Sequence, residues 1–302
     1  MTGIRGALAL LIFALMGAAC EAPADAPAVT SSAEPSAPSP SAEPIPPQTP
    51  TRAPLSQVTP AFIVEPTALD PTPTLAGITV PLPAERLAIF LPGPGSQVRS
   101  PIRIEGRGGP ARSERVHVRL LGEDGLVVAQ QTTYLYAASG QTGPFYTDLA
   151  FGISLVAEAG RLELSTDDPR TGRLGHLTTV NITLLSAGSP LVYPMLDGPE
   201  QLAILTPRPD SAASGGRLRV EGAGWTLVEQ PVTVSLLTQA GDALATEEIW
   251  LEPRGVGVTG RFAVDLEYSV PYPQYGLIAL YETAPDGSGF LHYTTLEIFL
   301  RR

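Results

Sequence analysis

The feature that most constrains the fold is a unit of about a hundred residues that occurs twice beyond residue 86. Short blocks of the first copy return in the same order in the second, at offsets of 115 to 117 residues. The matching pairs are Leu87 to Ile89 with Leu202 to Ile204, Ile104 to Gly106 with Val220 to Gly222, Val116 to Leu121 with Val232 to Leu237, Gly143 to Phe145 with Gly260 to Phe262, and His176 to Ile182 with His292 to Ile298. Small drifts in offset are expected at the loops of two copies of one fold, and each copy has the size of a domain.

Apolar residues alternate with polar ones inside each copy. Val116, Val118 and Leu120 are separated by His117 and Arg119, which indicates a half-buried antiparallel strand. Turn signals containing Gly, Asp or Pro separate such segments. Strands are expected near residues 87–91, 101–106, 115–121, 126–135, 144–151, 160–166 and 175–184, with counterparts in the second copy. The sequence therefore predicts an all-β chain with two tandem immunoglobulin-like β-sandwiches of about seven strands each.

The copies set the domain boundaries. We expect immunoglobulin-like domain 1 at residues 87–186, an inter-domain linker at 187–200 and immunoglobulin-like domain 2 at 201–302. The linker contains Leu191, Val192, Tyr193 and Leu196, so it is too apolar for a free tether. We expect these side chains to pack at the contact between the two domains.

The segment before the repeats has a different composition. Residues 21–86 hold 16 of the 32 prolines, together with many Ala, Ser and Thr residues. Such a segment has too little apolar area to offset the entropy of ordering, and its prolines favour extended backbone. We expect a disordered Pro-rich linker that acts as a spacer.

The first twenty residues read as an export signal. Arg5 is followed by an apolar run and then by small residues up to Ala19, and about ten apolar residues are too few to span a bilayer. With Cys20 directly after the small residues, the segment resembles a bacterial lipoprotein signal. The resemblance implies that Cys20 is acylated, becomes the mature N-terminus and anchors the exported protein to the membrane. The alternative is an ordinary signal peptide cut near Ala19, which would leave a free thiol.

The order of motifs in both units carries a second resemblance. An apolar strand ends in Pro92 or Pro207, a later strand ends in Glu-Gly, a Val-x-Val strand leads into a Gly turn, and a Gly-x-Phe strand follows. The second unit then has Asp286-Gly287 before its last strand. This order resembles the immunoglobulin-like domain of bacterial spore germination proteins, the Gmad type. The resemblance implies an extracytoplasmic accessory module rather than a particular chemistry.

Charge and cysteine content exclude several functions. The net charge is −11 and the 19 basic residues, all Arg, are scattered, which argues against nucleic-acid binding. One cysteine rules out an internal disulfide framework and any multi-Cys metal site. We find no recurring acid, base or nucleophile, so we expect no enzyme activity, cofactor or metal. His176 and His292 occupy equivalent positions, either as hydrogen-bonding structural residues or as a repeated ligand contact.

Three aromatic residues are candidate ligand contacts. Tyr134 and Trp250 are equivalent in the repeat, and Trp225 follows a glycine-rich segment. Each could pack in a core, or could stack on a sugar ring or a partner protein. The resulting expectation is a membrane-anchored, non-catalytic protein that presents two modules for protein binding or structural spacing. The alternative is a glycan or cell-wall binding module that uses these aromatic residues.

Overall fold

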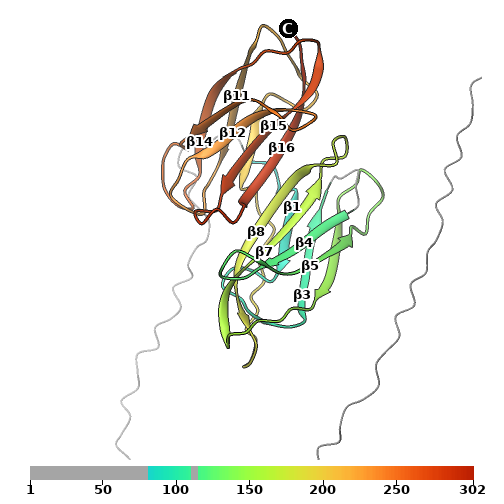
Figure 1. The fold of residues 1–302 in the computed structure, drawn as a ribbon, viewed down its shortest axis with the longest axis vertical. Coiled ribbons are helices and arrows are strands. Elements are labelled where there is room, and N and C mark those ends of the chain that lie inside the picture. Colours follow the sequence, from blue (N-terminus) through green and yellow to red (C-terminus); the bar gives the residue numbers. More distant parts are fainter. Residues whose placement is uncertain (1–80, 110–114) are drawn as a thin grey trace, which may run out of the picture. The chain divides into compact units, whose positions relative to one another are not determined.

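The computed structural model describes residues 81–109 and 115–302, so the expected signal peptide, its Cys20 and most of the expected Pro-rich linker lie outside the described residues. Every regular element among the described residues is a β-strand, as the alternating pattern predicts (Figure 1). Within these ranges no helix has the length and apolar character needed to cross a membrane. The all-β prediction is confirmed.

The first sandwich consists of two facing antiparallel sheets. One sheet has the order β1-β3-β6, and the other has the order β5-β4-β7-β8. The short β2 (Gln97–Arg99) pairs parallel with β8. The remaining strands are β1 (Leu87–Leu91), β3 (Ile102–Gly108), β4 (Arg115–Leu121), β5 (Val127–Tyr134), β6 (Gly143–Leu149), β7 (Ala157–Asp167) and β8 (Leu174–Leu185). Consecutive strands either pair in one sheet, as β4 does with β5 and β7 with β8, or pass to the opposite sheet, as in an immunoglobulin sandwich.

The second sandwich repeats this arrangement strand for strand. Its sheets have the orders β9-β11-β14 and β13-β12-β15-β16, and the two-residue β10 (Ala212–Ala213) pairs parallel with β16. The remaining strands are β9 (Leu202–Thr206), β11 (Arg217–Gly224), β12 (Val232–Thr238), β13 (Ala243–Ile249), β14 (Gly260–Glu267), β15 (Gln274–Thr283) and β16 (Phe290–Leu300). Over residues 81–109 and 115–302, each sandwich thus has eight strands rather than about seven. The additional strands, β2 and β10, are too short to show alternation.

The side-chain alternation read from the sequence matches the burial of the strands. Val116, Val118 and Leu120 of β4 are fully buried, while His117 and Arg119 lie on the outer face. The three buried side chains belong to the core of the first sandwich, together with Phe145 of the opposite sheet. An equivalent core in the second sandwich is built around Val232, Val234, Leu236 and Phe262.

A glycine opposite a phenylalanine explains two of the repeated motifs. Gly106 pairs with Phe145 across β3 and β6, and a Cβ at Gly106 would lie 2.5 Å from the Phe145 ring and 2.3 Å from the Ala88 carbonyl. Gly222 and Phe262 repeat the arrangement, with a ring distance of 2.4 Å. The aromatic ring covers the glycine backbone, so no larger residue fits there without displacing the core.

The segment between the sandwiches follows the first sandwich instead of packing its apolar side chains at the domain contact. Leu191 exchanges backbone hydrogen bonds with Gln97, and the Met195 N–H donates to the Phe90 carbonyl at 2.8 Å. The side chains of Leu191, Val192, Tyr193 and Leu196 are exposed. The expectation that they pack between the domains is wrong, because the backbone bonds along β1 and β2 turn these side chains toward solvent.

We expect Gly106→Ala and Gly222→Ala each to lower the free energy of unfolding by about 1 to 3 kcal/mol, because the new methyl group must displace a packed ring and a carbonyl. Gly152→Ala is the matched control, since a Cβ there meets nothing within 4 Å. Its effect is expected to stay within about 0.5 kcal/mol. Denaturant unfolding of the three variants measures both values, and equal stabilities for all three would contradict this account.

Candidate functional site

The two sandwiches meet where strand β8 of the first pairs with strand β16 of the second. Leu177 lies opposite Tyr293, and His176 lies opposite Thr294. This pairing joins the larger sheets into one ten-stranded sheet. The segments that enter each sandwich also pair: the Glu85 N–H donates to the Gly198 carbonyl at 3.0 Å, and the Glu200 N–H donates to the Pro83 carbonyl at 2.8 Å.

The β8–β16 ladder and the ladder formed by the two entry segments are each centred on a pair of residues that occupy equivalent positions in the two copies. Leu177 and Tyr293 differ by 116 residues, and the bridged Ala84 and Pro199 differ by 115. These are the offsets at which the sequence repeats. Each copy therefore presents the same surface to the other, as in the isologous interface of a symmetric dimer. The junction has the local two-fold arrangement of two subunits, although one chain supplies both.

Four buried ionisable side chains gather between the two ladders. We call Glu85, His176, Glu200 and His292 the Glu–His cluster. The His176 Nε2 lies 2.7 Å from a Glu85 carboxylate oxygen, and its Nδ1 lies 3.5 Å from Glu200. The His292 Nε2 lies 3.5 Å from Glu85 and 3.8 Å from Glu200. The two imidazole rings stand edge to face with their centroids 5.2 Å apart.

Position in the strand explains why the histidines are buried. His176 continues the row of β8 side chains that includes Val180, Ile182 and Leu184 and faces the core. Its counterpart His292 lies in β16 on the same side as Ile298. The glutamates each precede the first strand of a sandwich by two residues, and the paired entry segments turn their side chains inward.

Each carboxylate accepts a hydrogen bond from the backbone N–H of the residue that follows the other glutamate. The Arg86 N–H donates to Glu200 Oε2 at 2.9 Å, and the Gln201 N–H donates to Glu85 Oε2 at 3.2 Å. Arg86 and Gln201 are themselves equivalent in the repeat. The exchange fixes both carboxylates, and it leaves Glu85 Oε1 directed at His176 and Glu200 Oε1 directed at both histidines.

The second sandwich adds one acidic residue that the first lacks. Glu282 lies opposite His292 in the β15–β16 ladder, whereas Thr166 lies opposite His176 in the β7–β8 ladder. The Glu282 carboxylate accepts hydrogen bonds from the backbone N–H groups of Leu227 and Val228. Burial raises the pKa of Glu282 despite these bonds.

Burial and charge act in opposite directions on the cluster. Burial alone would raise the pKa of Glu85, but the hydrogen bond with His176 and the nearby imidazoles of His176 and His292 hold it well below its usual range. Burial alone would lower the pKa of His292, but contacts with Glu85, Glu200 and Glu282 raise it. The cluster is therefore stable only when its charges compensate one another.

Several polar atoms of the cluster have no hydrogen-bond partner. They are His176 Nδ1, Glu200 Oε1 and both ring nitrogens of His292. The side chains that carry them are 3% exposed or less. A buried polar atom without a partner is costly and rare in native proteins. Two nitrogen and two oxygen donors, all within 4.8 Å of one another, could hold one divalent metal ion.

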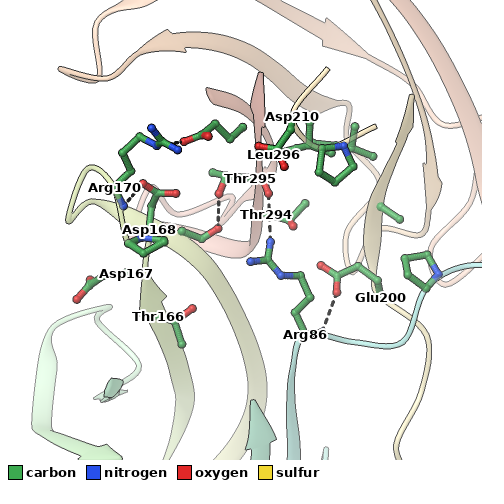
Figure 2. Close-up of a pocket in the computed structure, with 17 residues that line it drawn as sticks. Arg86, Thr166, Asp167, Asp168, Arg170, Glu200, Asp210, Thr294, Thr295 and Leu296 are labelled. Carbon is green, nitrogen blue, oxygen red and sulfur yellow. Dashed lines mark hydrogen bonds and ion pairs between the residues drawn. The ribbon is translucent and has the colours of Figure 1, made fainter. Parts of the chain in front are cut away.

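A cleft of about 490 Å³ opens beside the cluster, and Glu200 borders both. Figure 2 shows Arg86 reaching across the cleft, where its guanidinium donates to the Thr295 carbonyl at 3.1 Å. Arg170, on another wall, forms an ion pair with Glu297. The cleft is thus lined by residues of both copies. Both arginines bond to other residues that line the cleft.

Sequence reasoning identified the equivalent histidines but missed their acidic partners. The statement that no acid, base or nucleophile recurs is wrong, because Glu85 and Glu200 recur at an offset of 115 and both contact His176. Extending the Leu87 to Ile89 match by two residues toward the N-terminus would have revealed them. Composition places Glu85 in the expected Pro-rich linker and Glu200 in the expected inter-domain linker, so both lie outside the repeated blocks.

None of the three aromatic candidates belongs to the cluster. Tyr134 ends β5 and is 56% exposed, and Trp250 directly follows β13 and is 36% exposed. The Arg254 guanidinium lies 4.2 Å from the centre of the Trp250 ring. Trp225 is half-buried after β11, and its backbone N–H donates to the Gln201 carbonyl.

Comparison with known proteins does not identify a relative. The chain matches no known protein family, and no curated protein matches it. Among solved structures, red sea bream transglutaminase is 10% identical with a TM-score of 0.26, over 72% of this chain and 31% of that chain. A Salmonella alpha-2-macroglobulin reacted with methylamine is 11% identical with a TM-score of 0.26, over 74% and 15%. This chain therefore spans less than a third of either protein.

We expect the cluster to make stability depend on pH in protein kept free of metal by a chelator. Because the pKa of His292 is raised on folding, its contribution is fully present below its ordinary value of about 6.5 and is lost as the pH rises through the folded value. The difference in unfolding free energy between the unmodified chain and His292→Gln should shrink toward alkaline pH. Denaturant unfolding at several pH values measures it, and a difference that grows with pH would contradict the assignment.

Proposed function

We propose that this chain is an exported, non-catalytic protein, lipid-anchored through Cys20, that presents two immunoglobulin-like sandwiches as one rigid unit at the cell surface. Its role would be protein binding or structural spacing. The observation that supports this most strongly is the junction, in which β8 and β16 join the larger sheets of both sandwiches.

Three sets of contacts support rigidity. The β8–β16 ladder, the paired entry segments and the buried Glu–His cluster all cross between the copies. The connecting segment adds backbone hydrogen bonds from Leu191 and Met195 to the first sandwich. A tandem held in this way can keep two binding surfaces at a fixed spacing, whereas tandem domains joined by a free linker move independently.

The ends of the joined sheet are the surfaces best suited to a protein partner. Strand β5 ends the sheet in the first sandwich and β13 ends it in the second. A strand at the end of a sheet has unpaired backbone groups, to which an extended peptide can add as a further strand. Such binding would use the sandwiches as scaffolds and would require no catalytic group.

The composition of residues 21–80 suits a spacer below this unit, whereas Glu85 already belongs to the junction. About 60 residues would span roughly 45 Å as a flexible coil and on the order of 200 Å as polyproline helix. Either length would hold the sandwiches clear of the lipid headgroups. Several acyl chains on Cys20, each contributing about 0.8 kcal/mol per buried methylene, would provide a stable anchor.

Glycan or cell-wall binding through Trp225, Trp250 and Tyr134 is the alternative, and the described geometry favours it less. Trp225 is half-buried, and Arg254 stacks on the Trp250 ring. Tyr134 is well exposed but belongs to the other sandwich. These residues therefore offer less accessible ring surface than a stacking platform for sugars requires.

We expect Cys20→Ser to move the protein from the membrane fraction to the soluble fraction, because serine lacks the thiol that is acylated. Fractionation of expressing cells, with immunodetection of the sandwiches, measures the shift. His117→Gln, a substitution on the outer face of β4, is the control and should stay with the membrane. An unchanged membrane fraction for Cys20→Ser would contradict the anchor.

A further inference from the structure

The unpartnered atoms of the Glu–His cluster point inward from both sandwiches. Glu200 Oε1 and His292 Nε2 lie 3.8 Å apart, and neither forms a hydrogen bond. His292 Nε2 is also 3.5 Å from Glu85, and His176 Nδ1 is 3.5 Å from Glu200. These separations exceed normal hydrogen-bond lengths but are shorter than those of unrelated neighbouring side chains.

Separations of this size are also those expected between two ligand atoms that bind the same small metal ion. With bonds of about 2.0 to 2.1 Å to Zn²⁺ in tetrahedral geometry, neighbouring ligand atoms lie about 3.3 Å apart. The His292 Nε2 lies 3.5 Å from Glu85 and 3.8 Å from Glu200, and one ligand atom from each of the four residues falls within 4.8 Å of the others. Small side-chain rotations would bring this set to tetrahedral spacing.

We propose that Glu85, His176, Glu200 and His292 bind one Zn²⁺ ion, with one carboxylate oxygen from each glutamate and one ring nitrogen from each histidine. This metal site goes beyond the proposed function. Each sandwich supplies one histidine, and each of the two paired entry segments supplies one glutamate. The ion therefore links the two copies at the centre of their local two-fold arrangement.

The chemistry of the donors favours zinc over other common ions. Ca²⁺ and Mg²⁺ prefer six or more oxygen ligands, whereas Zn²⁺ accepts imidazole nitrogen and carboxylate oxygen in four-coordinate sites. Two ionised glutamates and two neutral histidines would balance the charge of the ion. Zinc binding would thus give partners to Glu200 Oε1 and to one of the two unpartnered ring nitrogens of His292, and it would leave the buried site without net charge.

The surroundings of the cluster resemble those of a structural metal site. The side chains of His176, Glu200 and His292 are 3% exposed or less, so solvent has little access to them. The Arg86 and Gln201 N–H groups hold the second oxygen of each carboxylate and orient the first. Outer hydrogen bonds of this kind are typical of zinc sites. Four protein ligands without an open position indicate a structural role rather than a catalytic one.

The test is metal titration of the purified full-length chain carrying Cys20→Ser, which removes the only thiol. After treatment with a chelator, we expect calorimetry to show one Zn²⁺ bound per chain. Co²⁺ in its place should give the intense visible absorption of a tetrahedral site. Zinc should also raise the melting temperature in a concentration-dependent manner, because it binds the folded state.

Variants assign the ligands. Glu200→Gln and His292→Gln should each weaken zinc binding by about 100-fold or more, since even loss of an outer hydrogen bond can cost up to that factor. His117→Gln removes the remaining histidine, which lies outside the cluster, and should leave binding unchanged. Circular dichroism shows whether each variant is folded. If a variant of the cluster does not fold, the Co²⁺ spectrum still tests the proposal, because it is recorded on the chain with all four ligands in place.

Three results would overturn the proposal. The first is a folded chain that binds no stoichiometric zinc. The second is zinc binding that is unaffected in folded Glu200→Gln and His292→Gln, which would place the ion elsewhere. The third is tighter binding of Ca²⁺, Mg²⁺ or Mn²⁺ than of Zn²⁺, or an octahedral Co²⁺ spectrum, either of which would contradict a tetrahedral zinc site.

Discussion

The antiparallel pairing of β8 with β16 is the interaction on which the rest of the structure depends. Each strand would otherwise be the edge of a sheet at this point, and a free edge invites unwanted pairing with other chains. By covering each other, the two strands join the larger sheets into one and bring His176 and His292 to a common centre. The duplicated unit thus closes on itself as a dimer does.

The buried charges at this centre restrict the junction to one arrangement. Desolvating two carboxylates and two histidines is costly, and the cost is offset only when each group meets its partners. A shift of β16 along β8 by one residue would reverse the faces of the side chains and leave Glu85 and Glu200 buried without a counter-charge. This requirement adds to the apolar contact on the opposite face of the junction, where Leu177 and Tyr293 are buried.

Much of the fold could be predicted from the sequence, because local patterns carry it. Alternation in the segment from Val116 to Leu120 gave the strand and its buried face, and the repeated Glu-Gly and Gly-x-Phe motifs reflect one glycine packed under one ring. The site could be predicted only in part. The equivalent histidines were visible, but no local pattern reveals that β8 and β16 pair. Glu85 and Glu200 lie outside the strands, where composition suggested linkers.

The central claim is that the junction makes the two sandwiches one rigid body. The ¹⁵N relaxation rates of backbone amides in each sandwich test it most directly, because they report the rotational diffusion of the body to which each amide belongs. A rigid junction predicts a single rotational correlation time for the strands of both sandwiches, with a value expected for their combined mass. Two shorter and different correlation times, one for each sandwich, would contradict it.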